Sequence, residues 1–200
     1  MMTRFTIANG VLTQAAFIAS PNFNLRPALP NSIGICGIVI HNISLPPNQF
    51  GKTNKDGTHF VKAFFQNKLD KNDHPYFKEI HAMQVSAHLF IERDGVITQF
   101  VNFNDRAWHA GHSRYLGRDN CNDFTIGIEL EGSDNTAFTD VQYDVLTDVI
   151  LAIYHAYPDT LHHLMGHSDI APVRKTDPGV HFDWVKLRQM LHDRQPQSEH

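Results

Sequence analysis

One segment constrains the fold of this chain more than any other: residues 33–43, which read IGICGIVIHNI. Apolar residues occupy both alternating faces of this run, as expected for a strand that is buried on both sides. Such a strand needs cover on each face, so it predicts a sheet with helices packed around it. Ile35, Gly37, Val39 and His41 share one face, and His41 lies where the strand leaves the core.

The other segments predict a mixed α/β fold, a central mixed sheet flanked by helices, in a single domain of residues 1–200. Hairpins are expected around Asn9-Gly10 and Asp94-Gly95, because these dipeptides suit tight turns with positive φ. Another strand is expected in FTIGIELEG, which ends at Gly132. Apolar residues at helical spacing predict helices in GTHFVKAFFQNKL, DVQYDVLTDVILAIYHAY and FDWVKLRQMLH.

Composition excludes several classes of protein. The 200 residues are 42% hydrophobic and carry a formal net charge of -4, so the basic excess typical of nucleic-acid binding is absent. No apolar stretch approaches the roughly 20 residues of a membrane span. Cys36 and Cys121 lack C-x-x-C spacing and are expected to be free thiols in a reducing compartment. We therefore expect a soluble cytoplasmic monomer that binds neither nucleic acid nor membrane.

The stretch GHSDIAPVRKTDPG, residues 166–179, concentrates groups that bind metals, and two kinds of site compete for it. In the first, His167 and Asp169 combine with a distal histidine such as His181. Two histidines and one carboxylate on one face leave positions open for ferrous iron and dioxygen. This H-x-D pattern is short and common by chance.

The second kind of site uses His41, His167 and Asp177 as zinc ligands, with water in the fourth position. Lys175 lies two residues before Asp177, so in an extended backbone both side chains point the same way. An ammonium group placed there would stabilise an oxyanion. On composition alone, a solvated charged turn is the simpler interpretation.

The predicted strand FTIGIELEG contributes a carboxylate. Alternation places Gly127, Glu129 and Glu131 on one face, and Gly127 leaves room next to the Glu129 side chain. A glutamate on a strand is usually solvated, so its position alone does not indicate catalysis.

Five stretches together carry a family resemblance: IVIHNISLPP, VSAHLFIERDG, RAWHAG, CNDFTIGIELEG and GHSDIAPVRKTDPG. In this order and at similar intervals they resemble AmpD-type 1,6-anhydro-N-acetylmuramyl-L-alanine amidases. These belong to the amidase_2 superfamily, which shares a zinc amidase fold with phage-type amidases and peptidoglycan recognition proteins. The resemblance implies that His41, His167 and Asp177 bind zinc, that Glu129 is the general base and that Lys175 is its electrostatic partner.

The resemblance also implies a function. The enzyme would hydrolyse the amide bond between N-acetylmuramic acid and L-alanine in soluble anhydromuropeptides during cytoplasmic cell-wall recycling. It would thereby lower the muropeptide signal that induces β-lactamase. A secreted amidase acting on polymeric peptidoglycan, a non-catalytic peptidoglycan-binding module and an iron oxygenase remain the alternatives. A binding module is expected to have lost a ligand or the base, whereas this chain has all four residues.

Substrate-binding candidates lie beside these groups. Asn42 follows His41 and would offer its amide to the L-alanine end of the product, a use that the resemblance supports. Trp108 and His109 in RAWHAG either line a sugar or peptide groove or pack on the core. His88 alternates with apolar residues in its strand and is expected to be a hydrogen-bonded core histidine.

Two positions depart from the family pattern. Relatives carry arginines before VSAH and before CND, where this chain has Gln84 and Asn120. Bidentate pairing with carboxylates of the stem peptide is therefore lost at both places. Arg114 or Arg118, in the same loop as Asn120, would have to compensate.

Overall fold

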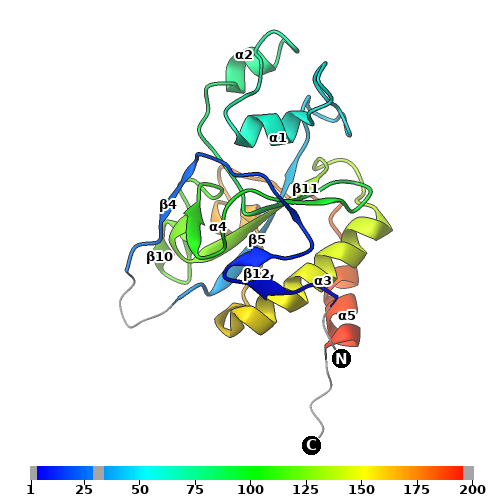
Figure 1. Cartoon of the computed structure of the whole chain (residues 1–200). Helices are drawn as coiled ribbons and strands as arrows, with labels where there is room; N and C mark the ends of the chain where they lie inside the picture. The colour runs from blue at the N-terminus through cyan, green and yellow to red at the C-terminus, as the bar shows by residue number, and fades with distance from the viewer. Residues whose placement is uncertain (1–3, 29–33, 196–200) are drawn as a thin grey trace, which may run out of the picture.

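The computed structural model describes residues 4–28 and 34–195, and its centre is a mixed sheet (Figure 1). The strand order is β12-β5-β11-β6-β7-β3. Strands β12, β5, β11 and β6 run parallel, β7 is antiparallel to β6, and β3 is parallel to β7. The expected mixed α/β fold is confirmed. The strand bounds are β3 Ala16–Phe17, β5 Gly37–Ile43, β6 Leu89–Ile91, β7 Ile97–Gln99, β11 Thr125–Glu131 and β12 Leu164–Gly166.

Helices α3 (Asp140–Ala156) and α5 (Trp184–Arg194) pack on one face of this sheet. A capping box begins α3, because the Thr139 hydroxyl accepts from the Gln142 backbone N–H while the Gln142 side chain accepts from the Thr139 N–H. The core between sheet and helices contains the apolar face predicted for the two central strands. Its members include Ile38, Ile40, Ile126, Ile128, Leu130, Leu146, Val149, Ile150, Ile153, Leu187 and Leu191.

The opposite face of the two central strands holds the polar residues. Strands β5 and β11 pair in a register that places Gly127 beside Val39 and Glu129 beside His41. Because side chains alternate, these four residues lie on one face, turned away from the core under α3. Parallel pairing thus brings a histidine and a glutamate from distant parts of the sequence to the same level of the sheet.

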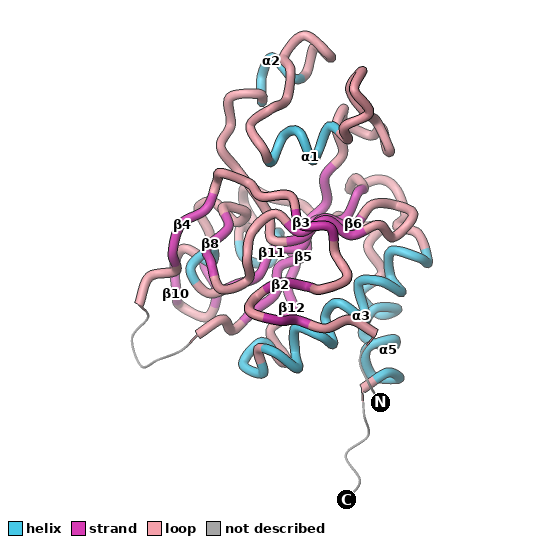
Figure 2. The backbone as a smooth tube through the Cα atoms, in the orientation of Figure 1, coloured by secondary structure: helices cyan, strands magenta, loops and turns pink. Residues whose placement is uncertain are grey.

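Residues 44–86 form an insertion between β5 and β6. It carries α1 (Phe60–Phe65) and α2 (Phe77–Ile80), which Figure 1 shows at the top of the view, away from α3 and α5. Most of the insertion is loop, as Figure 2 shows. It packs on Phe90 and Phe100, which lie beyond it in sequence, through an apolar cluster. The insertion contributes Leu45, Phe60, Val61, Phe64, Phe65, Leu69, Phe77 and Ile80 to this cluster.

Short two-stranded pairs complete the fold. The predicted hairpin at Asn9-Gly10 joins β1 (Ile7–Ala8) to β2 (Val11–Leu12), with φ of 51° at Asn9 and 78° at Gly10. The predicted hairpin between β6 and β7 turns at Gly95, where φ is 87°. Two more strand pairs are β4 Phe23–Leu25 with β8 Asp105–Ala107 and β9 Arg114–Tyr115 with β10 Arg118–Asp119. The short helix α4 spans His167–Ile170, and 3-10 turns span Cys121–Asp123 and Pro158–Thr160.

Two further expectations are met. Cys36 and Cys121 are free thiols. His88 is fully buried, and its ring nitrogens contact the Gly127 N–H at 3.0 Å and the Asp105 carbonyl at 3.1 Å. Within the described ranges, no helix is both long enough and apolar enough to span a membrane.

Candidate active site

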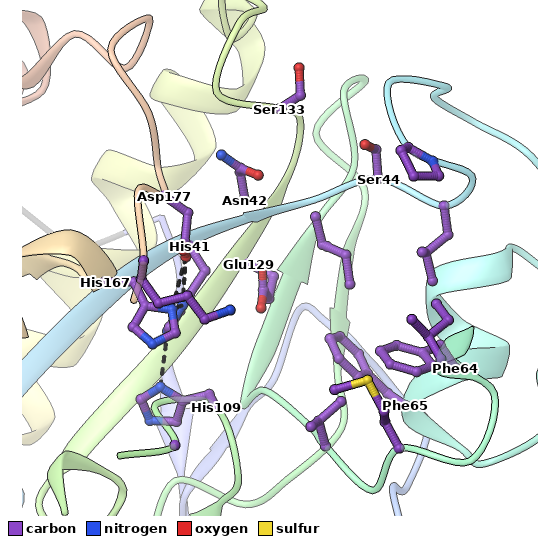
Figure 3. A pocket seen from close by; sticks show the side chains of 18 of the residues that line it. His41, Asn42, Ser44, Phe64, Phe65, His109, Glu129, Ser133, His167 and Asp177 are labelled. Carbon is purple, nitrogen blue, oxygen red and sulfur yellow. Dashed lines mark hydrogen bonds and ion pairs between the residues drawn. The ribbon is translucent and has the colours of Figure 1, made fainter. Parts of the chain in front are cut away.

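One cavity of about 810 Å³ opens at the carboxyl ends of β5 and β11. Its walls come from these strand ends, from residues 108–111, from residues 167–177 and from the insertion 44–86. The sequence candidates come from separate segments, yet all of them line this cavity: His41, Asn42, Trp108, His109, Glu129, His167, Lys175 and Asp177. Figure 3 shows most of these side chains around the opening.

Three ligand atoms converge in the cavity. His41 Nδ1 lies 2.9 Å from His167 Nδ1 and 3.1 Å from Asp177 Oδ2, and His167 Nδ1 lies 3.0 Å from Asp177 Oδ2. Both histidines are almost fully buried, with exposed fractions of 1% and 2%. Strand β5, the start of α4 and the loop after it thus bring together a group able to hold a metal ion (Figure 3).

The protonation of this group suits a cation. His167 Nε2 lies 3.1 Å from the Ala110 carbonyl oxygen, which only accepts, so the ring proton is on Nε2 and Nδ1 has a free lone pair. Burial lowers the pKa of His41 to about 4, so this ring is neutral near pH 7. Two imidazole nitrogens and a carboxylate oxygen facing one another are a donor set typical of zinc.

Glu129 lies beside this group on the neighbouring strand (Figure 3). Its side chain is buried, contrary to the usual solvated strand glutamate, and Oε2 has no hydrogen-bond partner. Burial raises its pKa well above the ordinary value; the Asp177 charge adds to this rise and the Lys175 charge opposes it. A buried carboxyl with an unpaired oxygen in a cavity is available to exchange a proton.

Lys175 is half-buried in the wall beside Asp177. Its positive charge acts to lower the pKa of both His41 and Glu129, which places its ammonium group within electrostatic reach of the metal-binding group and of the carboxyl. The sequence expectation that Lys175 and Asp177 face the same space agrees with this arrangement.

An unexpected residue, Asp134, ties two parts of the site together. Its carboxylate accepts from Asn42 Nδ2 at 2.7 Å and from the Thr176 hydroxyl, one residue before Asp177. The amide of Asn42 is therefore already directed to Asp134, and Figure 3 shows its oxygen on the cavity side. The sequence offers only a turn signal, GSDN after β11, and no sign of this contact.

Trp108 and His109 lie differently in the wall. Trp108 is half-buried, and its Nε1 donates to Asn24 Oδ1 at 2.7 Å. His109 is buried, and its Nδ1 lies 2.9 Å from His41 Nε2. The room expected beside Gly127 is not open next to Glu129, because the His109 ring fills it: a Cβ at Gly127 would lie 2.4 Å from His109 Cγ.

Comparison with known proteins identifies the family. Residues 31–180 match the family described as N-acetylmuramoyl-L-alanine amidase. The chain belongs to this amidase family. The resemblance drawn from the five motifs is thus confirmed, and so is the enzyme class.

Relatives of this amidase align over nearly its whole length. A protein of Haemophilus influenzae is 54% identical over 181 residues, covering 90% of this chain and 94% of its own. One of Escherichia coli is 46% identical over 187 residues, covering 92% and 96%. Both are named 1,6-anhydro-N-acetylmuramyl-L-alanine amidase AmpD.

Solved structures agree with the fold. The crystal structure of a selenomethionine AmpD derivative has a TM-score of 0.85 at 46% identity and covers 92% of this chain and 98% of that one. A complex of Escherichia coli AmiD with anhydro-N-acetylmuramic acid-L-Ala-D-gamma-Glu-L-Lys has a TM-score of 0.56 at 25% identity. It covers 93% of this chain and 65% of that one.

The alternative iron group is not assembled in the amidase. Asp169 caps its own helix, with Oδ2 accepting from the Gly166 N–H at 2.7 Å, and His181 is exposed. Asp169 therefore holds the loop that carries His167.

The positions that depart from the family pattern lie apart from one another. Gln84 lines the cavity, whereas Asn120 is an exposed residue with a φ of 58°. Arg114 pairs with Asp119 at 3.7 Å, and the Arg118 guanidinium lies 3.8 Å from the centre of a phenylalanine ring. Neither arginine is among the described residues of the cavity wall, so the expected compensation is not seen.

Sequence reasoning also missed the side of the cavity formed by the insertion. The spacing of Phe60, Phe64 and Phe65 indicated a helix but not which space the helix faces. In the structure, apolar residues of the insertion stand opposite the metal-binding group, and we call five of them the apolar wall: Phe64, Phe65, Tyr76, Ile80 and Met83.

Proposed function

We propose that this amidase is a cytoplasmic zinc enzyme that releases the peptide from 1,6-anhydro-N-acetylmuramyl peptides during peptidoglycan recycling. One observation carries the proposal: His41, His167 and Asp177 converge beside the unpaired carboxyl of Glu129 in one cavity. The names of the relatives support the substrate class, and the mixed polar and apolar walls suit a sugar linked to a peptide.

In this proposal His41, His167 and Asp177 hold the zinc ion. A zinc ion held there would polarise a substrate carbonyl and would lower the pKa of a bound water molecule to about 7. The chain supplies the ligands from three separate segments, so the metal site depends on the fold.

Glu129 moves the protons. Its carboxylate takes a proton from the attacking water, and the resulting carboxylic acid gives that proton to the nitrogen of the departing L-alanine. Burial favours this sequence of events, since a raised pKa lets the carboxyl hold a proton between the two transfers. The reaction needs no covalent enzyme intermediate.

Lys175 and Asn42 act on the substrate. The Lys175 ammonium stabilises the negative charge that develops on the carbonyl oxygen during attack, because its position is set before the reaction begins. Asn42, with its Nδ2 on Asp134, presents its oxygen to an N–H of the peptide.

Metal analysis tests the ligand set. The purified amidase should contain about one zinc per chain, and His41→Ala, His167→Ala and Asp177→Ala should each lose most of it. Asp169→Ala is the matched control, because this carboxylate caps a helix in the same stretch and should leave zinc in place. Full zinc retention in Asp177→Ala together with loss in Asp169→Ala would contradict the assignment.

Mass spectrometry tests the substrate. Digests of an anhydromuropeptide and of intact sacculi should differ, with rapid release of free peptide from the small substrate. Rapid release from sacculi alone would instead indicate an autolysin-type amidase.

A further inference from the structure

We infer that His109 is a positioning residue for the metal ligand His41 and not a substrate-binding residue. The inference rests on the proposed metal site. It concerns how the protein fixes which nitrogen of His41 faces the metal, a choice that a histidine with two similar ring nitrogens does not make by itself.

A chain of hydrogen bonds sets this choice, starting from a backbone carbonyl. The Thr125 hydroxyl lies 2.7 Å from the Cys121 carbonyl oxygen, which accepts only, so the hydroxyl proton must point there. Thr125 Oγ1 is then an acceptor toward His109 Nε2, which lies 3.3 Å away and must carry the ring proton. If the hydroxyl donated to His109 instead, Thr125 Oγ1 and the Cys121 carbonyl oxygen would be in contact with no proton between them.

The position of the proton on His109 in turn fixes the position of the proton on His41. Both rings are buried, with exposed fractions of 1% for His41 and 8% for His109, and burial favours the uncharged imidazole. With its proton on Nε2, His109 accepts at Nδ1 and takes the Nε2 proton of His41, at 2.9 Å. His41 Nδ1 is therefore left with its lone pair, turned toward His167 and Asp177.

The neighbouring residue supports the second ligand. The Ala110 carbonyl accepts from His167 Nε2 at 3.1 Å, which frees Nδ1 of that ring. Asn122 holds this two-residue segment in place, because its Oδ1 accepts the backbone N–H of both His109, at 3.0 Å, and Ala110, at 2.7 Å. One short segment thus orients both metal-binding imidazoles.

Strand β11 leaves space for this arrangement. A Cβ at Gly127 would lie 2.4 Å from His109 Cγ and 2.5 Å from its Nδ1, closer than atoms can approach. Only glycine lets the ring lie against the sheet at this level. Since both ring nitrogens contact protein atoms, His109 has no nitrogen left for a substrate.

The test measures zinc affinity by competition with a chromophoric chelator. His109→Leu should weaken zinc binding about 10- to 100-fold, the range typical of lost outer partners of metal ligands. His109→Gln should recover part of the affinity, since a carboxamide can accept from His41 and donate to Thr125. Trp108→Phe, the adjacent wall residue that makes no such contact, should change KM and leave zinc affinity unaltered.

Two further measurements keep the test decisive. Thr125→Val removes the hydroxyl that accepts from His109 and should weaken zinc binding by a smaller factor than His109→Leu does. If His109→Leu does not fold, Thr125→Val is the variant that tests the inference. The absorption spectrum of the cobalt-substituted protein should shift in His109→Leu, because the orientation of His41 changes.

Wild-type zinc affinity in folded His109→Leu, with a raised KM, would overturn the inference and make His109 a substrate contact. If His109→Leu does not fold, unchanged zinc affinity in Thr125→Val would overturn the inference. A wild-type protein that binds no zinc would contradict the proposed function instead, so the two failures are distinguishable.

Discussion

The two sides of the cavity are built in different ways. The polar wall comes from the ends of β5 and β11, the start of α4 and the loop after it, and its histidines and Asp177 have close polar partners. The apolar wall comes from the insertion 44–86, whose side chains pack mainly on one another and on Phe90 of β6 and Phe100 after β7. We expect the polar wall to determine catalysis and the apolar wall to determine how tightly substrate binds. The polar wall comprises His41, Glu129, His167, Lys175 and Asp177.

Strand β11 connects the two sides. Glu129 faces the metal-binding group, while Glu131, two residues later, accepts from the Gly51 N–H and from His59 Nε2, at 3.0 Å for the histidine. These contacts anchor the insertion and hold the pKa of Glu131 below its ordinary value, although burial acts in the opposite direction. Two glutamates on one strand face thus have different surroundings: Glu129 lies unpaired beside the metal-binding group, and Glu131 holds the insertion.

Replacing the base should give the largest effect. Glu129→Gln should lower kcat about 10²- to 10⁴-fold and leave zinc content unchanged, because it removes proton transfer without altering a metal ligand.

In the wild type, kcat/KM should fall with decreasing pH as Glu129 gains its proton. Because burial raises this pKa, the fall should begin at a higher pH than an exposed carboxyl would give. Steady-state kinetics across pH, with zinc content measured in parallel, provide the check.

Glu131→Gln is the matched control for this experiment. It should keep most of the turnover per folded molecule and lower the melting temperature, since it weakens the anchor of the insertion. An inactive Glu131→Gln beside an active Glu129→Gln would mean that the base is misassigned.

Lys175→Ala should have the next largest effect. In the proposed mechanism its charge acts on an oxyanion that exists only in the transition state, so kcat should fall about 10²- to 10³-fold while KM changes little. Lys175→Arg should restore only part of the rate, because a planar guanidinium does not reproduce a compact ammonium group. An unchanged kcat in Lys175→Ala, measured with full zinc content, would show that the residue is a solvated turn residue.

The contrast between the walls also explains what the sequence could predict. Apolar alternation predicted strands β5 and β11 and the faces that they turn to the core. The Asn-Gly and Asp-Gly dipeptides predicted both hairpins, because these signals are local. The convergence of His41, His167 and Asp177 was expected from motifs whose spacing resembles a known family. Position along the sequence was enough in each of these cases.

Features set by long-range packing could not be predicted. The pattern of FTIGIELEG does not show that the Glu129 carboxyl is buried, nor that the space beside Gly127 is filled by the His109 ring from another segment. The apolar wall depends on how the insertion packs against Phe90 and Phe100, which lie beyond it in sequence. Asp134 likewise becomes a partner of Asn42 only once the sheet is assembled.

The smallest expected effect is the one that tests the apolar wall itself. Met83 lines the cavity with 48% of its surface exposed, so shortening it should cost the free protein little stability. A bound substrate that covers this side chain would gain about 1 kcal/mol of apolar burial, so Met83→Ala should raise KM roughly fivefold and leave kcat and zinc content unchanged. Leu25→Ala is the control, because Leu25 is 78% exposed and is not part of the cavity wall, and its KM should match the wild type. If Met83→Ala instead lowers kcat at constant KM, the insertion contributes to the chemical step and the division between the two walls is wrong.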